Sequence, residues 1–378
     1  MRLRRAAPIL SVLASCGADA PDRAAPSQCA GAELIVAASD YSSSLLCRAP
    51  GCENAGATTG LDLGADPMLV GSNGRMFWIA RDVDQLFEVD PSCGTPATRT
   101  SLRAFAPKDP RTGEVVPANP HGAAAAADGT VIVPLYSAAT LLFVRDGAIE
   151  PLNLAEYDKV DGNPQADAVS IVRVGDSEKA FVTLERLDDR DGLVSKRASQ
   201  MLRVDVATRK VEAVIELAGR NPFNPMAELE GALFLAEPGS FTSITEDLAG
   251  IERFDTATST TRLLVRESAL GGSVVEVAVT SGCGVAIVAG PEQDVNPTSV
   301  VAFDPETGRV LDRVVPSTPG FDLSGLAWRG DSLYVGDRRR GPTGYPVHVF
   351  ERAGACTLTA TGRTIHIPQR PVALRNAR

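Results

Sequence analysis

Polar side chains beside prolines recur along the chain, and their types are those that could bind a metal ion or a ligand. The pairs are Asp66-Pro67, Asn119-Pro120, Asn163-Pro164 and Asn221-Pro222, with His121 directly after the second pair. Oxygen atoms of this kind are the ligands that Ca²⁺ prefers, so a ring of them could hold calcium. The alternative is a backbone role, because proline biases the residue before it towards extended geometry and suits a loop that leads into a strand. We favour the backbone role and predict no metal site and no cofactor, with calcium as the alternative.

Motifs of nucleophilic catalysis are absent from the sequence. It has no Gly-x-Ser-x-Gly elbow, and its three histidines are scattered at positions 121, 348 and 366. The acidic run at 185–192 departs from the spacing of a calcium-binding loop. We therefore assign no catalytic residue. The binding candidates are the polar residues beside the prolines, namely Asn119, His121, Asn163, Asn221 and Asn224.

The charge balance speaks against nucleic acid as a partner. The 378 residues carry a formal net charge of −10, whereas phosphate binding depends on a concentrated lysine and arginine surface. Hydrophobic residues make up 44% of the chain and charged residues 22%. This composition indicates a globular protein with a sizeable core.

The first residues have the pattern of a secretion signal. Arg2, Arg4 and Arg5 precede a short apolar stretch at 6–14 that is too short to span a bilayer. The segment Leu13-Ala14-Ser15-Cys16 resembles a lipobox, and this resemblance implies cleavage before Cys16 and lipid attachment to its sulfur. We expect a lipoprotein signal peptide at 1–15 and a lipidated tether at 16–30. An ordinary signal peptide with an incidental cysteine is the alternative.

Six cysteines remain after Cys16, and an even number favours disulfides in an exported protein. They are Cys29, Cys47, Cys52, Cys93, Cys283 and Cys356. Cys47 and Cys52 are near enough in the chain to close one tight turn, but the sequence does not select among the pairings that six cysteines allow. Zinc binding is disfavoured, because there is no Cys-x-x-Cys pair and histidines are few.

A repeated strand-and-turn segment predicts the architecture. Seven copies of an apolar strand ending in an acidic or turn-forming segment begin at residues 45, 86, 142, 202, 251, 301 and 347. Their spacing of roughly fifty residues is slightly longer than the period of a four-stranded propeller blade. Runs rich in β-forming residues lie between them, such as 75–80 and 332–336, and glycine-containing turns such as Ser72-Asn73-Gly74 precede several of these runs.

The repeats predict an all-β, seven-bladed β-propeller over residues 31–378. Complete blades are expected at 66–101, 119–153, 164–217, 222–265, 272–315 and 321–366. Residues 33–62 are expected to supply the second, third and fourth strands of the seventh blade, and residues 370–374 its first strand. Pairing of the N- and C-terminal strands then closes the ring and protects sheet edges.

Two segments resemble the signature strand of YVTN-type seven-bladed propellers, namely Phe181-Val182-Thr183-Leu184 and Leu333-Tyr334-Val335-Gly336. The segments 221–226 and 231–239 are similar to uncharacterised propeller lipoproteins of myxobacteria-like bacteria. The resemblance covers nearly the whole mature chain and implies fold and location, not chemistry. Lactone-hydrolysing propellers also use a metal-binding glutamate, and the sequence does not place one at the start of an inner strand.

Strand alternation sorts the connections onto two faces. The turns between first and second strands and between third and fourth strands share one face with all six cysteines, here called the disulfide face. The other connections share the opposite, loop-rich face with the residues beside the prolines and with the longest insertions, at 185–200, 237–250, 290–298 and 336–346. Binding is expected on the loop-rich face, because function concentrates on loops carried by a rigid scaffold.

These features together predict a monomeric, non-enzymatic binding or scaffolding protein. The lipid on Cys16 would hold it at a membrane, and the loop-rich face would engage a protein, a peptide or a glycan. Gly17 stands where an aspartate retains enterobacterial lipoproteins at the inner membrane, so the outer membrane of the cell envelope is favoured. The alternative is a metal-dependent, lactonase-like hydrolase working in the central funnel.

Overall fold

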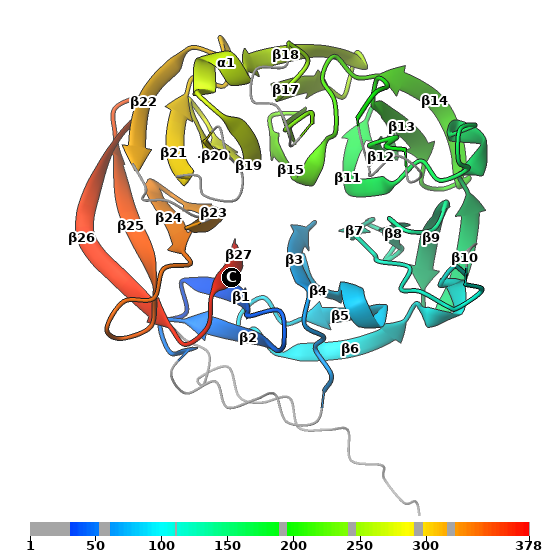
Figure 1. Cartoon of the computed structure of the whole chain (residues 1–378), viewed down its shortest axis with the longest axis horizontal. Helices are drawn as coiled ribbons and strands as arrows, with labels where there is room; N and C mark the ends of the chain where they lie inside the picture. The colour runs from blue at the N-terminus through cyan, green and yellow to red at the C-terminus, as the bar shows by residue number, and fades with distance from the viewer. Residues whose placement is uncertain are drawn as a thin grey trace, which may run out of the picture.

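A ring of antiparallel sheets forms the whole of the described chain (Figure 1). The computed structural model describes residues 31–52, 61–109, 112–188, 195–240, 247–290, 298–315 and 322–377. Seven sheets lie within these residues and are arranged as blades around a central axis. The all-β, seven-bladed propeller is therefore confirmed. The signal peptide, Cys16, the tether and Cys29 lie outside the described residues.

Six blades have four strands each, running from the axis outwards. Blade 1 contains β3 (Pro67–Ser72), β4 (Arg75–Ala80), β5 (Gln85–Val89) and β6 (Pro96–Ser101). Blade 2 contains β7 (Ala124–Ala125), β8 (Val131–Leu135), β9 (Thr140–Arg145) and β10 (Ala148–Asn153). Blade 3 contains β11 (Ala166–Val174), β12 (Ser177–Leu184), β13 (Gln200–Asp205) and β14 (Lys210–Glu216).

The next three blades repeat this order. Blade 4 contains β15 (Phe223–Leu229), β16 (Ala232–Glu237), β17 (Gly250–Asp255) and β18 (Thr260–Arg266). Blade 5 contains β19 (Ser273–Thr280), β20 (Cys283–Ala289), β21 (Thr298–Phe303) and β22 (Val310–Val315). Blade 6 contains β23 (Leu323–Arg329), β24 (Ser332–Asp337), β25 (Tyr345–Ala353) and β26 (Thr357–Ile367). The helical segments described are 3-10 helices at Arg81–Val83, Arg103–Phe105 and Ala155–Tyr157 and the short helix α1 (Glu267–Leu270).

Blade 7 joins the two ends of the chain. It contains β27 (Pro371–Asn376), β1 (Leu34–Ser39) and β2 (Ser44–Ala49). β1 pairs antiparallel with β27, with Val36 opposite Leu374, and Figure 1 shows the two strands side by side. The predicted closure is confirmed. Of the three strands expected from residues 33–62, two are present as β1 and β2, and the third would lie mainly at residues 53–60, outside the described residues. A disulfide joins Cys47 at the end of β2 to Cys52.

Hairpin turns inside the blades follow the glycine pattern of the sequence. Asn73 and Gly74 connect β3 to β4 and have φ angles of 46° and 79°. Positive φ at both central residues defines the type I′ turn, whose twist matches that of paired strands. Ser72 therefore lies opposite Arg75, as a two-residue turn requires. This predicted turn is confirmed.

The core consists of one apolar cluster between each pair of neighbouring blades. Side chains alternate between the two faces of every strand, so each sheet can present apolar groups to both neighbours. At the boundary of blades 3 and 4, for example, the rings of Phe181 and Phe254 pack edge to face with centroids 5.3 Å apart. Fully burying a side chain of this size contributes roughly 1.5–3 kcal/mol. Packing between blades, repeated around the ring, holds the channel in shape.

Disulfides lie on the disulfide face, as the sequence predicts. Cys47 bonds Cys52 with Cα atoms 5.3 Å apart, and Cys283 bonds Cys356 with Cα atoms 4.9 Å apart. The second bond joins blade 5 to blade 6. Cys93 is disulfide-bonded as well. Within the described residues, no helix is both long and apolar enough to cross a membrane.

Candidate functional site

The central channel holds two cavities that meet at a narrow waist. The cavity that opens on the loop-rich face, here called the mouth cavity, has a volume of about 350 Å³. The cavity on the side of the disulfide face, here called the rear cavity, has a volume of about 270 Å³. Pro225, Glu276 and Arg375 line both cavities and therefore form the waist.

An exposed tyrosine stands at the rim of the mouth cavity. Tyr41 is 55% exposed and has a φ angle of 65°, which is a rare conformation for a bulky residue. The tight turn between β1 and β2 imposes this angle, because the hydroxyl oxygen of Ser39 accepts the backbone N–H of Tyr41 at 2.9 Å. Hydrogen bonds from the Ser42 hydroxyl and the backbone lower the pKa of Asp40 in the same turn to about 2. The guanidinium of Arg338 lies 5.6 Å from the centre of the Tyr41 ring.

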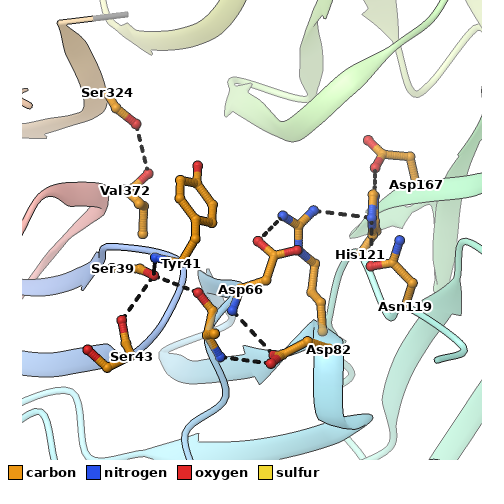
Figure 2. Close-up of polar contacts among 12 residues, drawn as sticks. Ser39, Tyr41, Ser43, Asp66, Asp82, Asn119, His121, Asp167, Ser324 and Val372 are labelled. Atoms are coloured by element: carbon orange, nitrogen blue, oxygen red, sulfur yellow. Dashed lines mark hydrogen bonds and ion pairs between the residues drawn. The ribbon is translucent and has the colours of Figure 1, made fainter.

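An ion pair between Asp66 and Arg81 lies beside this tyrosine (Figure 2). The carboxylate of Asp82 accepts the backbone N–H groups of Ala65 at 2.9 Å and Asp66 at 3.3 Å, which fixes the loop that enters blade 1. Ser39 donates its hydroxyl to the carbonyl of Ala65 at 2.6 Å and so ties this loop to blade 7. The side chains of Asp66 and Arg81 are therefore held in place in the absence of a ligand.

His121 continues the network towards blade 3 (Figure 2). Its Nδ1 lies 2.5 Å from Oδ1 of Asp167, and its Nε2 lies 3.2 Å from Nη1 of Arg81. Arginine can only donate a hydrogen bond and a carboxylate can only accept one, so Nδ1 carries the proton and Nε2 is the acceptor. The ring of Tyr136 stacks on the imidazole with centroids 4.2 Å apart. Burial lowers the pKa of His121 while Asp167 opposes the shift, and the imidazole is neutral at neutral pH.

The structure brings two of the sequence candidates, Asn119 and His121, together at the channel. The side-chain amide of Asn119 lies 3.1 Å from Nε2 of His121, and the NH₂ end of that amide is the one that can donate to an unprotonated ring nitrogen. The buried carboxylate of Asp84 in blade 1 accepts the backbone N–H groups of Ala118 at 2.8 Å and of Asn119 at 3.3 Å. A blade 1 side chain therefore positions the loop that carries both candidates.

The other three candidates lie in different places. Asn224 lines the mouth cavity and donates its amide to the carbonyl of Val275 at 2.7 Å. Asn163 lies behind the site, where it donates to the carbonyl of Tyr136 at 3.1 Å. Asn221 is buried at the boundary of blades 3 and 4 and donates to the carbonyl of Gly239 at 2.8 Å, away from the channel lining.

The extended geometry expected before the prolines is wrong at three asparagines. Asn119, Asn221 and Asn224 have φ angles of 54°, 58° and 69°. Asparagine tolerates this left-handed region because its short side chain bonds locally to the backbone. These residues reverse the chain direction at the start of a blade, whereas Asp66 and Asn163 do not have positive φ angles.

Five residues of the site were missed by the sequence reasoning, namely Tyr41, Arg81, Asp167, Glu276 and Arg375. Arg81 and Tyr41 lie in short connections without a motif. Asp167 and Glu276 follow the openings of blades 3 and 5 by a few residues, so the repeat itself placed them near the axis. The position of Arg375 in the closing strand was the only available indication of its place in the channel.

The oxygen ring considered for calcium is not assembled as such. Asp66 pairs with Arg81, and the amide groups of Asn163 and Asn221 donate to backbone carbonyls. The described part of the chain has no group of three or more His, Cys, Asp or Glu side chains that could hold a metal ion. The expectation of no metal site stays a prediction, with calcium as its alternative.

Comparisons with known proteins identify the architecture. No protein-family model matches the chain, and no curated protein matches it. Among solved structures, the periplasmic gluconolactonase PpgL of Pseudomonas aeruginosa has a TM-score of 0.57 at 15% identity, over 92% of this chain and 99% of that one. Kuenenia stuttgartiensis hydrazine synthase has a TM-score of 0.54 at 14% identity, over 78% and 80%.

A third solved structure, apo AztD from Citrobacter koseri, has a TM-score of 0.51 at 12% identity, over 91% of this chain and 97% of that one. The chemistries named for these proteins differ, and similarity at such low identity shows the fold alone. The chain is thus a seven-bladed β-propeller whose function has to be argued from its own channel.

Proposed function

We propose that this protein is a lipid-anchored component of the cell envelope that binds a polar ligand, a short glycan or a peptide, at the mouth of its central channel. The lipobox-like sequence at Cys16 supports the anchor, and Gly17 supports the outer membrane. The mouth cavity supports the binding role. These two parts of the proposal rest on separate observations and can be tested separately.

The observation that carries the binding role is the rim residue Tyr41 beside a preformed polar cavity. The cavity of about 350 Å³ lies within the size range of small-molecule sites. The positive φ of Tyr41 costs about 1–2 kcal/mol relative to an ordinary conformation. The fold maintains this exposed ring through the Ser39 contact, and such strain is typical of ligand-binding positions.

The polar groups around the ring are already in place. Arg81 and Asp66 hold one another, and Asp82 fixes the backbone beneath them. The amide of Asn224 is anchored on blade 5. A ligand would therefore meet groups whose conformational entropy has been lost on folding, which favours affinity. An aromatic ring next to fixed donors and acceptors suits a sugar ring or a peptide segment, each of which has apolar and polar edges.

An array of soluble glycans and short peptides tests this proposal. The probe is the mature chain with Cys16→Ser, together with Tyr41→Ala and Arg81→Gln variants. Arg309→Gln serves as the control, because Arg309 is exposed in the turn between the third and fourth strands of blade 5, on the disulfide face. We expect binding to at least one array member that is lost in both mouth variants and kept in the control. No binding, or binding that survives both mouth substitutions, contradicts the proposal.

A second candidate function is hydrolysis of a lactone, and the contact between His121 and Asp167 favours it. The carboxylate orients the imidazole and leaves Nε2 unprotonated, as a general base requires. Arg81 occupies that nitrogen, so a water molecule could reach it only after Arg81 moved. Incubation with a panel of lactones, with and without calcium, decides between the functions: turnover that disappears in His121→Ala would establish the hydrolase, and the binding proposal expects none.

A further inference from the structure

One arginine lies deep in the channel without a carboxylate partner at ion-pairing distance. Arg375 lines both cavities at the waist. Its side chain makes one hydrogen bond within the described residues, from Nη1 to the carbonyl of Leu374 at 2.6 Å. No described carboxylate lies within ion-pair distance of its guanidinium. The other N–H groups of the Arg375 guanidinium are therefore free to bond a ligand in the channel.

The nearest acid is already engaged elsewhere. Glu276 on β19 accepts the backbone N–H groups of Gly325 at 2.9 Å and Leu326 at 3.0 Å, one with each carboxyl oxygen. These bonds tie the inner strand of blade 5 to that of blade 6. Burial raises the pKa of Glu276, and the charge of Arg375 opposes that shift. Glu276 thus balances the arginine from a distance without occupying its hydrogen-bond donors.

A second arginine without an acidic partner stands at the entrance. Arg338 lies over the ring of Tyr41 at the rim and forms no ion pair in the described part of the chain. The mouth cavity therefore has guanidinium groups without an ion-pair partner at its rim and at its floor. Its lining carries three arginines against the two acids Asp66 and Glu276, in a protein of net charge −10. Positive charge confined to a cleft of an acidic protein attracts small anions and excludes cations.

We propose that Arg375 binds a carboxylate of the ligand, and that the ligand of the mouth cavity is a small organic acid. This inference rests on the proposed binding function and specifies its ligand class. The carboxylate enters past Arg338 and meets the guanidinium at the waist, where two parallel N–H···O bonds can form. Guanidinium and carboxylate match in such a bidentate geometry, which lysine does not reproduce. The uncharged part of the ligand then lies against Tyr41 and Asn224.

A matched pair of sugars tests the charge requirement by isothermal titration calorimetry. Galacturonate and galactose share one ring and differ by a carboxylate in place of a hydroxymethyl group. A second pair, N-acetyl-alanyl-alanine and its C-terminal amide, differs by a carboxylate in place of a neutral carboxamide. The first pair represents acidic sugars and the second the C-terminal end of a peptide. We expect the acid to bind more tightly than its neutral counterpart in at least one pair.

Variants of Arg375 tie that preference to one residue. Arg375→Gln should weaken binding of the acid by roughly tenfold to a hundredfold, since a charge-assisted hydrogen bond is lost, and leave the neutral counterpart unchanged. Arg375→Lys should keep part of the preference. Arg309→Gln removes the same charge on the disulfide face and should leave both affinities unchanged. Thermal unfolding of every variant verifies that each is folded.

Several results would overturn this inference. They are equal binding of acid and neutral compound in both pairs, an acid preference that persists in Arg375→Gln, and the absence of any acid binding at millimolar concentration. Equal binding that depends on Tyr41 would leave the proposed binding function standing and remove only the ligand class. If Arg375→Gln is unfolded, Arg375→Lys decides the question, because an unreduced acid affinity in that variant contradicts bidentate binding.

Discussion

The channel mouth and the boundary between blades 3 and 4 both bury ionisable side chains, but they neutralise charge in different ways. At the mouth, Asp66 faces Arg81, and the network continues through His121, which lines the rear cavity, to Asp167. At the boundary, Glu237 and Glu252 face one another. The Asp66–Arg81 ion pair keeps opposite charges available to a ligand at neutral pH, whereas two carboxyls in contact cannot both ionise readily. The first arrangement suits recognition, and the second makes the fold sensitive to pH.

Glycine packing marks the boundary as the more tightly constrained region. Glu252 accepts the backbone N–H of Gly219 at 2.6 Å, and Glu237 is fully buried directly against the same glycine. Burial and the neighbouring Glu252 raise the pKa of Glu237 well above its usual value. Burial and the close contact of the two carboxyls therefore both favour the protonated form of Glu237 in the folded state.

The largest effect is expected from Gly219→Ala. The new Cβ would lie 1.6 Å from Oε2 of Glu237, so this buried carboxyl would have to leave its position beside Glu252. We expect a loss of about 3 kcal/mol or more in the free energy of unfolding, measured by urea denaturation. Gly71→Ala is the control, because a Cβ there meets its nearest atom at 3.9 Å. Combining Gly219→Ala with Glu237→Ala should restore part of the stability; no restoration would show that Glu237 is not the obstacle.

A smaller gain is expected from Glu237→Gln. The pKa of Glu237 is higher in the folded protein than in the unfolded chain, where it is about 4.5. The protonated carboxyl therefore contributes its full stability below about pH 4.5, and this contribution declines as the pH rises through the folded pKa. Glutamine keeps the shape and needs no proton. The variant should be about 1–3 kcal/mol more stable than the parent at pH 8 and converge with it in acid. Glu216→Gln, at an exposed position of β14, should change little at either pH.

The channel network around His121 should respond to pH in the opposite direction. Burial lowers the pKa of His121 below its value of about 6.5 in the unfolded chain. The contribution of the neutral imidazole to the stability of the fold is therefore complete above about pH 6.5 and is lost as the pH falls through the folded pKa. His121→Gln should remove roughly 1 kcal/mol of the acid-induced loss between pH 7 and pH 5. Glu237→Gln should retain that loss. If His121→Gln and Glu237→Gln both changed the free energy of unfolding in the same pH range, the contrast between the two regions would be wrong.

The smallest change in stability is expected from Tyr41→Gly. Glycine adopts the φ angle of 65° without the steric cost that tyrosine carries, but it also makes the unfolded chain more flexible. The two effects nearly cancel, so the unfolding free energy should stay within about 1 kcal/mol of the parent. Ligand affinity should fall clearly in the same variant. A large loss of stability would show that Tyr41 serves the fold instead of the ligand.

The blades could be predicted from sequence because the repeat contains the same information several times. Turns such as Asn73-Gly74 and strands such as 75–80 each have a local sequence pattern, and similar patterns recur in several blades. Closure of the ring by residues 370–374 could be predicted because each end of the chain has strand-like segments without another partner. The fourth strand expected for blade 7 would lie mainly at residues 53–60, outside the described residues, and stays a prediction.

The site was predicted only where the repeat reaches the channel. Asn119 and His121 follow a blade opening, and the repeat placed them correctly near the axis. Asn221 has the same local sequence but is turned into the boundary between blades, where its amide bonds Gly239. Arg375 and Glu276 have no motif at all, because their role arises from the meeting of blades 5, 6 and 7 at the waist.

The most direct test of the central claim follows the side-chain Nε–H signals of arginine by NMR while galacturonate is added to the mature protein. Arg375→Lys and Arg309→Gln variants assign the signals of the waist and of the disulfide face. The account predicts that the Arg375 signal shifts with saturation and that the Arg309 signal does not move. An unmoved Arg375 signal at saturating galacturonate would contradict it.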